Sequence, residues 1–267
     1  MSKPLIPAQR CEWIDDCLSV HKIARIADLS KALDVSEATI RRDLGWLESE
    51  GVLERTYGGA ILSRRIQLEP EYAYRAQTHT EEKCQIGLAV ADLVEDGDII
   101  FVNSGTTSTQ VIRHIPAGAE VTVITNNIGA ALEVGETGFE LILLGGTFQP
   151  RSNSVAGRFA IENLSHVYAS KAFVGVDGVS LKYGCTVPTS GEAQVVRQML
   201  ERTRGLITVM ADHSKWGVVS NFEIATIDQV HRLVTDDDLG PDAHAALAAH
   251  SVEILTAGAA LGLNRST

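Results

Sequence analysis

Hydrophobic residues in the N-terminal part of the chain recur at helical spacing. Within residues 9–20, Ile14 and Leu18 lie four positions apart and predict one face of an amphipathic helix. The short run KIARI that follows is expected to be extended. A second short helix that ends near Asp34 is expected from the spacing of four apolar residues: Ile26, Leu29, Leu33 and Val35.

A third helix is expected over residues 36–50. Ser36 is a suitable N-cap, and the carboxylate of Glu37 complements the positive end of the helix. The core face of this helix consists of Ile40, Leu44 and Leu47. The run VLERTYGGAILS then predicts a β-hairpin that turns near Gly58 and Gly59. Three helices followed by a hairpin are typical of a winged helix-turn-helix.

The pattern changes in the second part of the chain. Residues 63–80 are polar and include a proline, so we expect a connector with an ordered turn around Glu71–Arg75. From residue 81 onward, short β-branched runs alternate with helical segments, as in a parallel α/β sheet. Strands are expected at 98–103, 120–125, 140–145, 171–176, 206–211 and 230–235, and helices at 81–95, 106–115, 127–136, 190–203 and 242–250.

These patterns predict a two-domain α/β protein, which agrees with a length of 267 residues. We expect a winged helix-turn-helix domain over residues 1–62 and a linker over 63–80. An α/β domain over 81–256 and a loose tail over 257–267 complete the chain.

The composition is that of a soluble globular protein, with 45% hydrophobic and 21% charged residues. No apolar run approaches the roughly 20 residues of a membrane helix, and the first residues lack the apolar core of a secretory signal. We therefore expect a cytoplasmic protein without a membrane partner. The cysteines form no C-x-x-C pair or zinc spacing, so we expect reduced thiols and neither a metal site nor a cofactor: Cys11, Cys17, Cys84 and Cys185.

The net charge of −11 is unevenly distributed. Residues 1–65 hold ten Lys or Arg and ten Asp or Glu, so the remainder of the chain carries the whole negative charge. An acidic body repels DNA, and any DNA contact is therefore expected in the N-terminal part alone.

The third helix has a second face that suits entry into a DNA groove. Its stripe of Ala38, Arg41, Arg42 and Gly45 lies away from the core face, so two guanidinium groups stand beside small residues. Arginine can contact guanine edges with two hydrogen bonds. Further candidate contacts to bases or phosphates come from the helix start and from the hairpin: Ser36, Thr39, Arg55 and Tyr57.

The simpler interpretation is a solvated helix surface, on which the two arginines pair with Glu37, Asp43 or Glu48. An isolated Arg-Arg pair on a helix would favour that interpretation. The helix-turn-helix spacing and the basic hairpin together favour DNA binding.

In the second domain, polar and glycine residues follow the expected strands. They occur in NSGTTS (103–108), TNN (125–127), GG (145–146), VGVDGV (174–179) and ADHSKWG (211–217). Ligands of open α/β sheets bind at the carboxyl ends of the strands, so these loops are expected to converge. Ser104-Gly105-Thr106-Thr107 offers hydroxyls and a helix N-terminus to a phosphate, Lys215 a positive charge, and Asp177 an acceptor for sugar hydroxyls.

Each of these loop motifs also has a purely structural interpretation. S-G-T-T alone is more often a helix cap than a phosphate site, and Asp212 is as well suited to capping its own turn as to contacting a ligand. The shared position at the strand ends is what favours a binding pocket.

The stretch TIRRDLGWLESEGVLERTYGGA resembles the DNA-binding signature of the DeoR family of bacterial transcriptional regulators. That family pairs an N-terminal winged helix with a C-terminal effector-sensing domain, and the resemblance continues through the second domain. It implies sequence-specific contacts to double-stranded DNA by Thr39, Arg41 and Arg42.

The second domain also resembles the fold shared by ribose-5-phosphate isomerase, glucosamine-6-phosphate deaminase and the CoA transferases. This resemblance implies contacts to a phosphorylated sugar or polyol effector at Ser104, Gly105, Thr106, Thr107, Asn126, Asp177, Glu192 and Lys215. The isomerase uses a D-G-A-D-E run for proton transfer, whereas this chain has Asp177-Gly178-Val179-Ser180-Leu181. With a single carboxylate left, no catalytic residue is expected. Cys185 is expected to be a small packed residue rather than a reactive thiol.

Three functions follow from these expectations. The first is a homo-oligomeric repressor of a sugar or polyol catabolic operon, released from its operator by a phosphorylated effector. The alternative is a phosphosugar isomerase, deaminase or transferase with an accessory DNA-binding domain. In a third hypothesis the second domain only oligomerises, and its pocket no longer binds a ligand.

Overall fold

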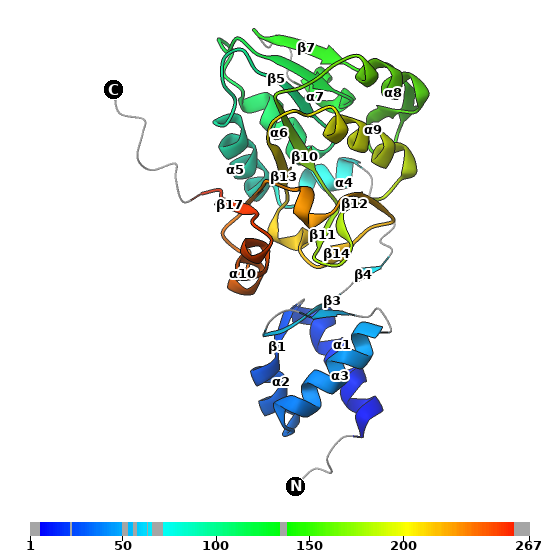
Figure 1. Ribbon diagram of the computed structural model, residues 1–267, viewed down its shortest axis with the longest axis vertical. Helices are drawn as coiled ribbons and strands as arrows, with labels where there is room; N and C mark the ends of the chain where they lie inside the picture. Colours follow the sequence, from blue (N-terminus) through cyan, green and yellow to red (C-terminus); the bar gives the residue numbers. More distant parts are fainter. Residues whose placement is uncertain are drawn as a thin grey trace, which may run out of the picture.

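The computed structural model describes residues 6–21, 23–49, 53–55, 58–62, 64–65, 72–133 and 138–258. The N-terminal domain contains α1 (Pro7–His21), β1 (Ile23–Arg25), α2 (Ile26–Leu33), α3 (Glu37–Ser49), β2 (Leu53–Arg55) and β3 (Gly59–Leu62). The strands form one antiparallel sheet in the order β1-β3-β2. This is the expected winged helix-turn-helix, and the run predicted to be extended forms its first strand (Figure 1).

The sequence features that predicted α3 also explain how it is held. Ser36 caps the helix, since its Oγ accepts a hydrogen bond from the main-chain N of Thr39 at 3.3 Å. Ile40, Leu44 and Leu47 are buried in the core of this domain. Gly59 of β3 lies so close to β1 that an added Cβ would sit 2.2 Å from the Ala24 carbonyl oxygen, which explains a glycine at this position.

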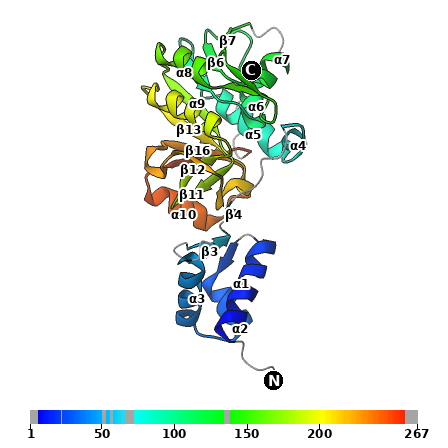
Figure 2. The ribbon, with the colours of Figure 1, turned by 90° about the vertical axis from the view of Figure 1, so that its right-hand side faces the viewer.

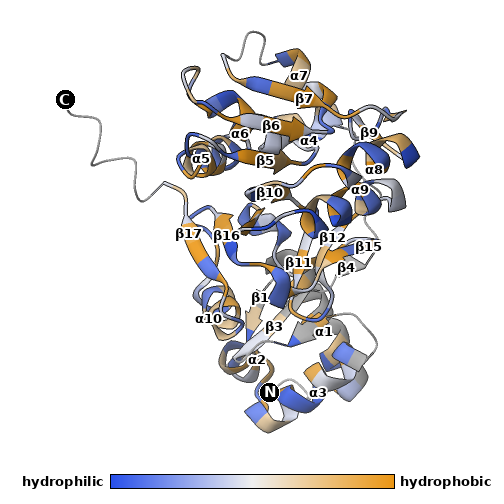
Figure 3. Ribbon diagram, turned by 45° about the horizontal axis from the view of Figure 1, so that its top comes forward, coloured by the Kyte–Doolittle hydropathy of each residue, from blue (hydrophilic) through white to orange (hydrophobic). Residues whose placement is uncertain are grey.

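The second domain is built on a seven-stranded parallel sheet in the order β17-β16-β13-β10-β5-β6-β7. Its strands are β5 (Ile99–Val102), β6 (Thr122–Thr125), β7 (Glu140–Leu143), β10 (Lys171–Gly175), β13 (Ile207–Met210), β16 (Arg232–Thr235) and β17 (Glu253–Thr256). Figure 3 shows that β5 and β6 are mainly hydrophobic, whereas the covering helices α8 and α9 carry both kinds of residue.

Helices cover both faces of this sheet (Figures 1 and 2). They are α5 (Thr80–Ala91), α6 (Thr106–His114), α7 (Ile128–Glu133), α8 (Arg158–Ser165), α9 (Ser190–Glu201) and α10 (Pro241–Ala249). Ile100 and Val102 of β5 pack with α5 and α6, whereas Phe101 between them packs in the core that includes α8, α9 and α10. Successive side chains therefore enter opposite cores, as in a doubly wound α/β fold.

Several elements of this domain differ from expectation. The segment from 81 to 95 is helical only to Ala91, and the segment from 127 to 136 is helical from Ile128 to Glu133, with 134–136 outside the described residues. Further short elements were not predicted: β8 (Thr147–Gln149), β9 (Ser154–Ala156), α8, β11 (Gly178–Ser180), β12 (Gly184–Val187), β15 (Phe222–Ala225), the 3-10 turns η1 (His213–Lys215) and η2 (Ile227–Gln229), and β17.

The predicted loose tail begins too early. β17 ends at Thr256, and Ala257 is buried, with its main-chain N donating to the Thr235 carbonyl at 2.7 Å. The rest of the predicted tail, residues 259–267, lies outside the described residues. Within the described ranges, no helix combines the length and apolar character needed to cross a bilayer.

The segment between the domains contains two ordered elements. β4 (Arg64–Arg65) pairs in parallel with β14 (Val218–Val219) of the second domain. The expected turn is a short helix, α4 (Tyr72–Gln77), and Glu71 at its start lies outside the described residues. The linker is therefore attached to the second domain at both of its described ends.

Candidate DNA-binding face and effector pocket

The outer stripe of α3 is exposed. Arg41 and Arg42 both reach solvent, and Arg41 Nη2 lies 2.8 Å from Glu37 Oε2 one turn earlier. Exposed pairs of this kind contribute roughly 0.3–0.5 kcal/mol, too little to keep Arg41 from a stronger partner. Asp43, considered above as a partner of the arginines, is instead buried and binds Arg10 of α1 through two hydrogen bonds of 2.8 and 3.0 Å.

The other candidate DNA contacts lie around the same stripe. Thr39 is half-buried, and its Oγ1 lies 3.0 Å from Ser36 Oγ, so both hydroxyls are at the start of α3. Arg55 on β2 is exposed, and its Nη1 would lie 3.9 Å from a Cβ added to Gly45. A third guanidinium group therefore lies beside the stripe. Tyr57 is outside the described residues.

In the second domain, the loops after β5, β10 and β13 converge on one cleft. Seven of the eight predicted effector residues line it: Ser104, Gly105, Thr106, Thr107, Asp177, Glu192 and Lys215. The cleft is completed by Ser108, Gly175 and Val176 and by two cations that the sequence did not indicate, Arg75 and Lys83. The cleft thus combines hydroxyl groups, three cationic side chains and two carboxylates.

Asn126 lies elsewhere. Its side chain is fully buried, and its Nδ2 donates to the Val155 carbonyl oxygen at 3.0 Å. Its main-chain oxygen accepts from the Val155 N at 3.0 Å, so Asn126 joins the end of β6 to β9. Asn126 is therefore not among the residues that line the cleft, and within the described part of the chain its Oδ1 has no hydrogen-bond partner.

The start of α6 forms one wall of the cleft. Gly105 has a φ of +141°, which favours glycine, and the nine-residue helix begins at the next residue. Asn103 fixes this loop against β10, because its Nδ2 donates to the Gly175 carbonyl at 2.9 Å and its Oδ1 accepts from the Gly175 N at 2.8 Å. Main-chain N–H groups and hydroxyls at a helix start form a favourable environment for an anion.

Lys83 on α5 is a buried cation at the cleft. Its Nζ donates to the carbonyl oxygens of Arg75 and Thr78, each at 2.6 Å. Burial lowers the pKa of Lys83 to about 8; nearby Asp212 opposes this shift, while Lys215 and Arg75 add to it. A bound anion would relieve part of this cost by pairing with the amine.

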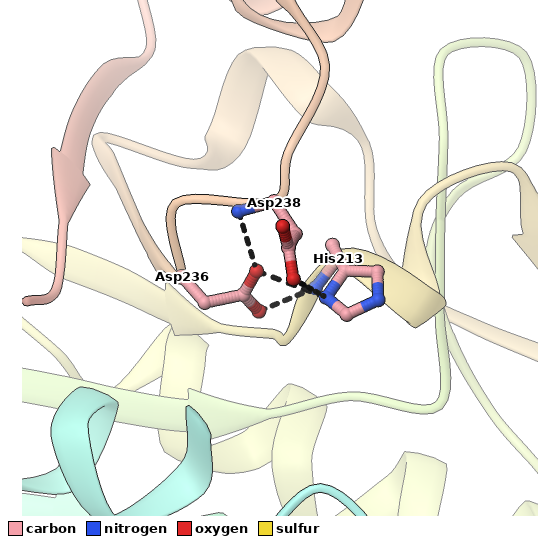
Figure 4. Close-up of side chains that lie close together, drawn as sticks. All are labelled: His213, Asp236 and Asp238. Carbon is pink, nitrogen blue, oxygen red and sulfur yellow. Dashed lines mark hydrogen bonds and ion pairs between the residues drawn. The ribbon is translucent and has the colours of Figure 1, made fainter. Parts of the chain in front are cut away.

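The turn that carries Lys215 is anchored from two sides. Asp212 Oδ1 accepts hydrogen bonds from the N and Oγ of Ser214, the capping role considered above. Burial alone would raise the pKa of Asp212. The attraction of Lys215 and other neighbours is stronger, so the pKa of Asp212 lies below its usual value. In Figure 4, the buried Asp236 accepts from the main-chain N and ring Nδ1 of His213, and Asp238 lies beside them.

His213, Asp236 and Asp238 lie close enough together to offer a metal ion three ligand atoms. Both oxygens of Asp236 already accept hydrogen bonds from main-chain N–H groups, those of His213 and Asp238. We therefore interpret the cluster as an anchor for η1.

Asp177 and Cys185 occupy different environments. Asp177 Oδ1 lies 3.3 Å from Arg75 Nη1 at the cleft, whereas Ser180, where the isomerase run has its second acid, is fully buried and accepts from the Tyr183 N. Cys185 is buried in β12, and burial raises its pKa to about 12, as expected for a packed and unreactive thiol.

Comparison with known proteins agrees with this organisation. The DeoR-like helix-turn-helix domain family matches residues 10–65, and the DeoR C terminal sensor domain family matches residues 78–237. The HTH-type transcriptional repressor GlcR of Bacillus subtilis is 35% identical over 229 residues, covering 85% of this chain and 88% of that protein. The HTH-type transcriptional regulator GlpR of Haloferax volcanii is 29% identical over 251 residues, covering 94% of this chain and 98% of that protein.

Among solved structures, ribose 5-phosphate isomerase A from Methanocaldococcus jannaschii aligns with a TM-score of 0.38 and 17% identity, covering 52% of this chain and 55% of that chain. A likeness this weak does not bear on function. The family matches and the curated relatives are regulators, which confirms the regulator hypothesis and gives the enzyme alternative no support. The chain therefore belongs to the DeoR family of transcriptional regulators.

Proposed function

We propose that this protein represses a sugar or polyol catabolic operon and leaves its operator when a phosphorylated sugar or polyol binds the cleft. The observation that carries the proposal is that one cleft contains both anion-binding groups and carboxylates. Hydroxyls, the start of α6, Lys83 and Lys215 favour an anion, while Asp177 and Glu192 offer acceptors for sugar hydroxyls. The relative GlcR is named as a transcriptional repressor, which supports repression over activation.

Operator recognition is assigned to α3 and the hairpin. Arg41 and Arg42 would contact base edges, while Ser36, Thr39 and Arg55 would contact phosphates or neighbouring bases. Tyr57, outside the described residues, stays a candidate from the sequence. One winged helix reads few base pairs, so we further propose a cytoplasmic homo-oligomer that binds paired half-sites.

Release follows from differential affinity. If the effector binds the DNA-free form more tightly than the DNA-bound form, its binding shifts the population away from the operator. The sensor domain needs no catalytic group for this.

The first test is a thermal-shift screen of the full chain against sugar and polyol phosphates, with each unphosphorylated parent as its control. A ligand at 100 times its dissociation constant adds about 2.7 kcal/mol of stability. We expect at least one phosphate to raise the melting temperature while its parent does not. Silence across the whole panel would contradict a phosphosugar effector.

Two lysine variants, one at the cleft and one away from it, can be compared in the same screen. Lys215→Ala should lose the shift and also the effector-dependent release of DNA, while its operator affinity in the absence of effector stays near normal. Lys182→Ala is the control, because Lys182 is exposed and does not line the cleft. Retained release in Lys215→Ala would remove this lysine from the site.

A further inference from the structure

The candidate effector cleft is nearly filled. Its free volume is about 30 Å³, whereas sites for small molecules usually measure roughly 300–1,000 Å³. The free space therefore suits a water molecule or two and not a phosphosugar. Whatever fills the cleft has to move before a ligand of that size enters.

Arg75 of the linker helix α4 lines the cleft and lies against Asp177. Its Nη1 lies 3.3 Å from Asp177 Oδ1, and the two side chains are only 12% and 19% exposed. Asp177 is the carboxylate proposed to accept the sugar hydroxyls. In the structure, a cation from the linker pairs with it.

The described contacts that hold α4 include an ion pair and hydrogen bonds, among them one from the Tyr72 main-chain N to the Arg151 carbonyl oxygen at 2.9 Å. None of its six residues is buried. Besides the Arg75–Asp177 ion pair, the Tyr72 hydroxyl lies 3.1 Å from Thr109 Oγ1, and Lys83 donates to the Arg75 carbonyl. A second cavity of about 170 Å³ lies along the same helix, lined in part by Tyr72, Ala76 and Lys83. A segment with so little buried apolar surface opens at low free-energy cost.

The other described end of the linker, β4, also contacts a segment that is connected to the cleft. β4 pairs with β14, which begins three residues after Lys215. Gly217 lies between Lys215 and β14, and its N–H donates to the Val179 carbonyl oxygen at 2.8 Å. Val179 is two residues after Asp177. Both cleft loops are therefore joined to the segment that leads to the DNA-binding domain.

We propose that Arg75 senses occupancy of the effector site: effector hydroxyls replace its guanidinium on Asp177, and α4 then leaves the sensor domain. This mechanism rests on the proposed function above. With the cleft empty, the ion pair holds the linker in the arrangement that binds the operator. With the cleft filled, α4 loses its ion pair to the sensor domain, and the DNA-binding domains lose their fixed placement.

The test measures hydrogen exchange of the α4 amides in the full-length protein without any ligand. Arg75→Met and Asp177→Asn each remove one side of the ion pair with little change in size. Because a hydrogen bond to a charged group stabilises the closed arrangement of α4, its loss makes opening more frequent. We expect about tenfold faster exchange at residues 72–77 in each variant. Asp228→Asn is the control, since it removes the exposed His250–Asp228 contact away from the cleft.

The double variant separates one shared contact from two independent effects. If Arg75 and Asp177 act as a pair, Arg75→Met with Asp177→Asn should exchange no faster than either single variant. Exchange at wild-type rates in folded single variants, or effects that multiply in the double variant, would overturn the proposal.

Operator binding supplies the functional readout. Both single variants should bind operator DNA at least about tenfold more weakly than wild type in the absence of effector. Affinity within twofold of wild type would overturn the link between α4 and DNA. Neither measurement uses a phosphosugar. A silent phosphosugar screen would therefore refute the effector class and leave the role of Arg75 standing. Unchanged exchange and operator binding would refute the role of Arg75 and leave the effector class standing.

Discussion

Arg42 tests the DNA-binding assignment more directly than Arg41. Arg41 has to leave Glu37, whereas Arg42 has no ion-pair partner within the described part of the chain. We expect Arg42→Ala to weaken operator binding by roughly 1–3 kcal/mol if the guanidinium contacts a base. Its melting temperature should stay unchanged, because the side chain is exposed. Mobility-shift titrations at fixed salt measure the loss.

The charge-matched control for that experiment is Arg158→Ala, which removes an exposed arginine from α8 of the sensor domain. If Arg42 contacts only a phosphate, binding should weaken for every DNA sequence alike and the salt slope should fall by about 1. Full affinity in a folded Arg42→Ala protein would return the arginine pair to the solvated-surface interpretation.

We expect Lys83 to make effector binding depend on pH. Its pKa is lowered from 10.5 to about 8, chiefly by burial. Between these values the unfolded chain holds more protons than the folded one, so the Lys83 contribution to stability rises with pH across that window. A phosphate is a dianion throughout, because its second pKa is about 6, and it needs the lysine charged. We expect the affinity for a stabilising phosphosugar to fall as the pH rises above about 8.

Calorimetric titrations across that pH range measure this loss, which approaches tenfold per pH unit in its steep part. Lys83→Met should bind more weakly at neutral pH and lose the dependence. A pH profile in Lys83→Met that matches wild type would mean that another group titrates.

At the scale of the element, one buried ion pair joins α1 to α3. Arg10 and Asp43 have side chains that are only 10% and 6% exposed, and they share two hydrogen bonds. Removing one partner leaves an uncompensated buried charge, which costs about 3–5 kcal/mol. We therefore expect Arg10→Ala to lower the melting temperature of the DNA-binding domain markedly, as followed by circular dichroism.

Two further variants qualify that result. Arg10→Met combined with Asp43→Leu should recover much of the stability, because it replaces the pair with apolar side chains of similar size. Arg232→Ala breaks the pair between Arg232 and the exposed Glu253 and should cost less than about 1 kcal/mol. A mild effect of Arg10→Ala would show that water reaches Asp43.

The elements that could be predicted from the sequence are those with a strong local signal. α3 has a cap at Ser36 and three core residues at helical spacing, and its bounds are confirmed to within one residue. β11, β12 and β17 have three or four residues each, too few to show a period, and β12 also pairs with β15, which is distant in the chain.

The same contrast applies to the cleft. The loops after the strands converge because parallel strands share a carboxyl edge, a rule that needs only the strand order. Arg75 precedes the sheet and meets Asp177 across 102 positions of sequence. Asn126 follows a strand as the cleft loops do, but its Nδ2 donates to β9, and the residue does not line the cleft. Contacts of this kind depend on tertiary packing, which hydrophobic periodicity does not encode.

At the scale of the whole molecule, the two domains have separate cores. Twelve buried residues from α1 to β3 form one cluster, while the two clusters around the parallel sheet contain only residues from Ile86 onward. Between the described parts of the two domains, Arg25 lies 3.8 Å from Asp242, and the linker adds the β4–β14 pairing. Such domains should unfold in separate steps.

Scanning calorimetry of the full chain tests this independence. We expect two transitions, of which a stabilising phosphosugar raises only that of the sensor domain. A stabilisation of about 2.7 kcal/mol at 100 times the dissociation constant corresponds to roughly 5–10 °C for a domain of this size. Arg10→Ala should lower only the other transition, which assigns each peak to its domain. A single transition that both changes move would mean that the linker couples the cores in folding, and effector release would then act through global stability rather than through α4.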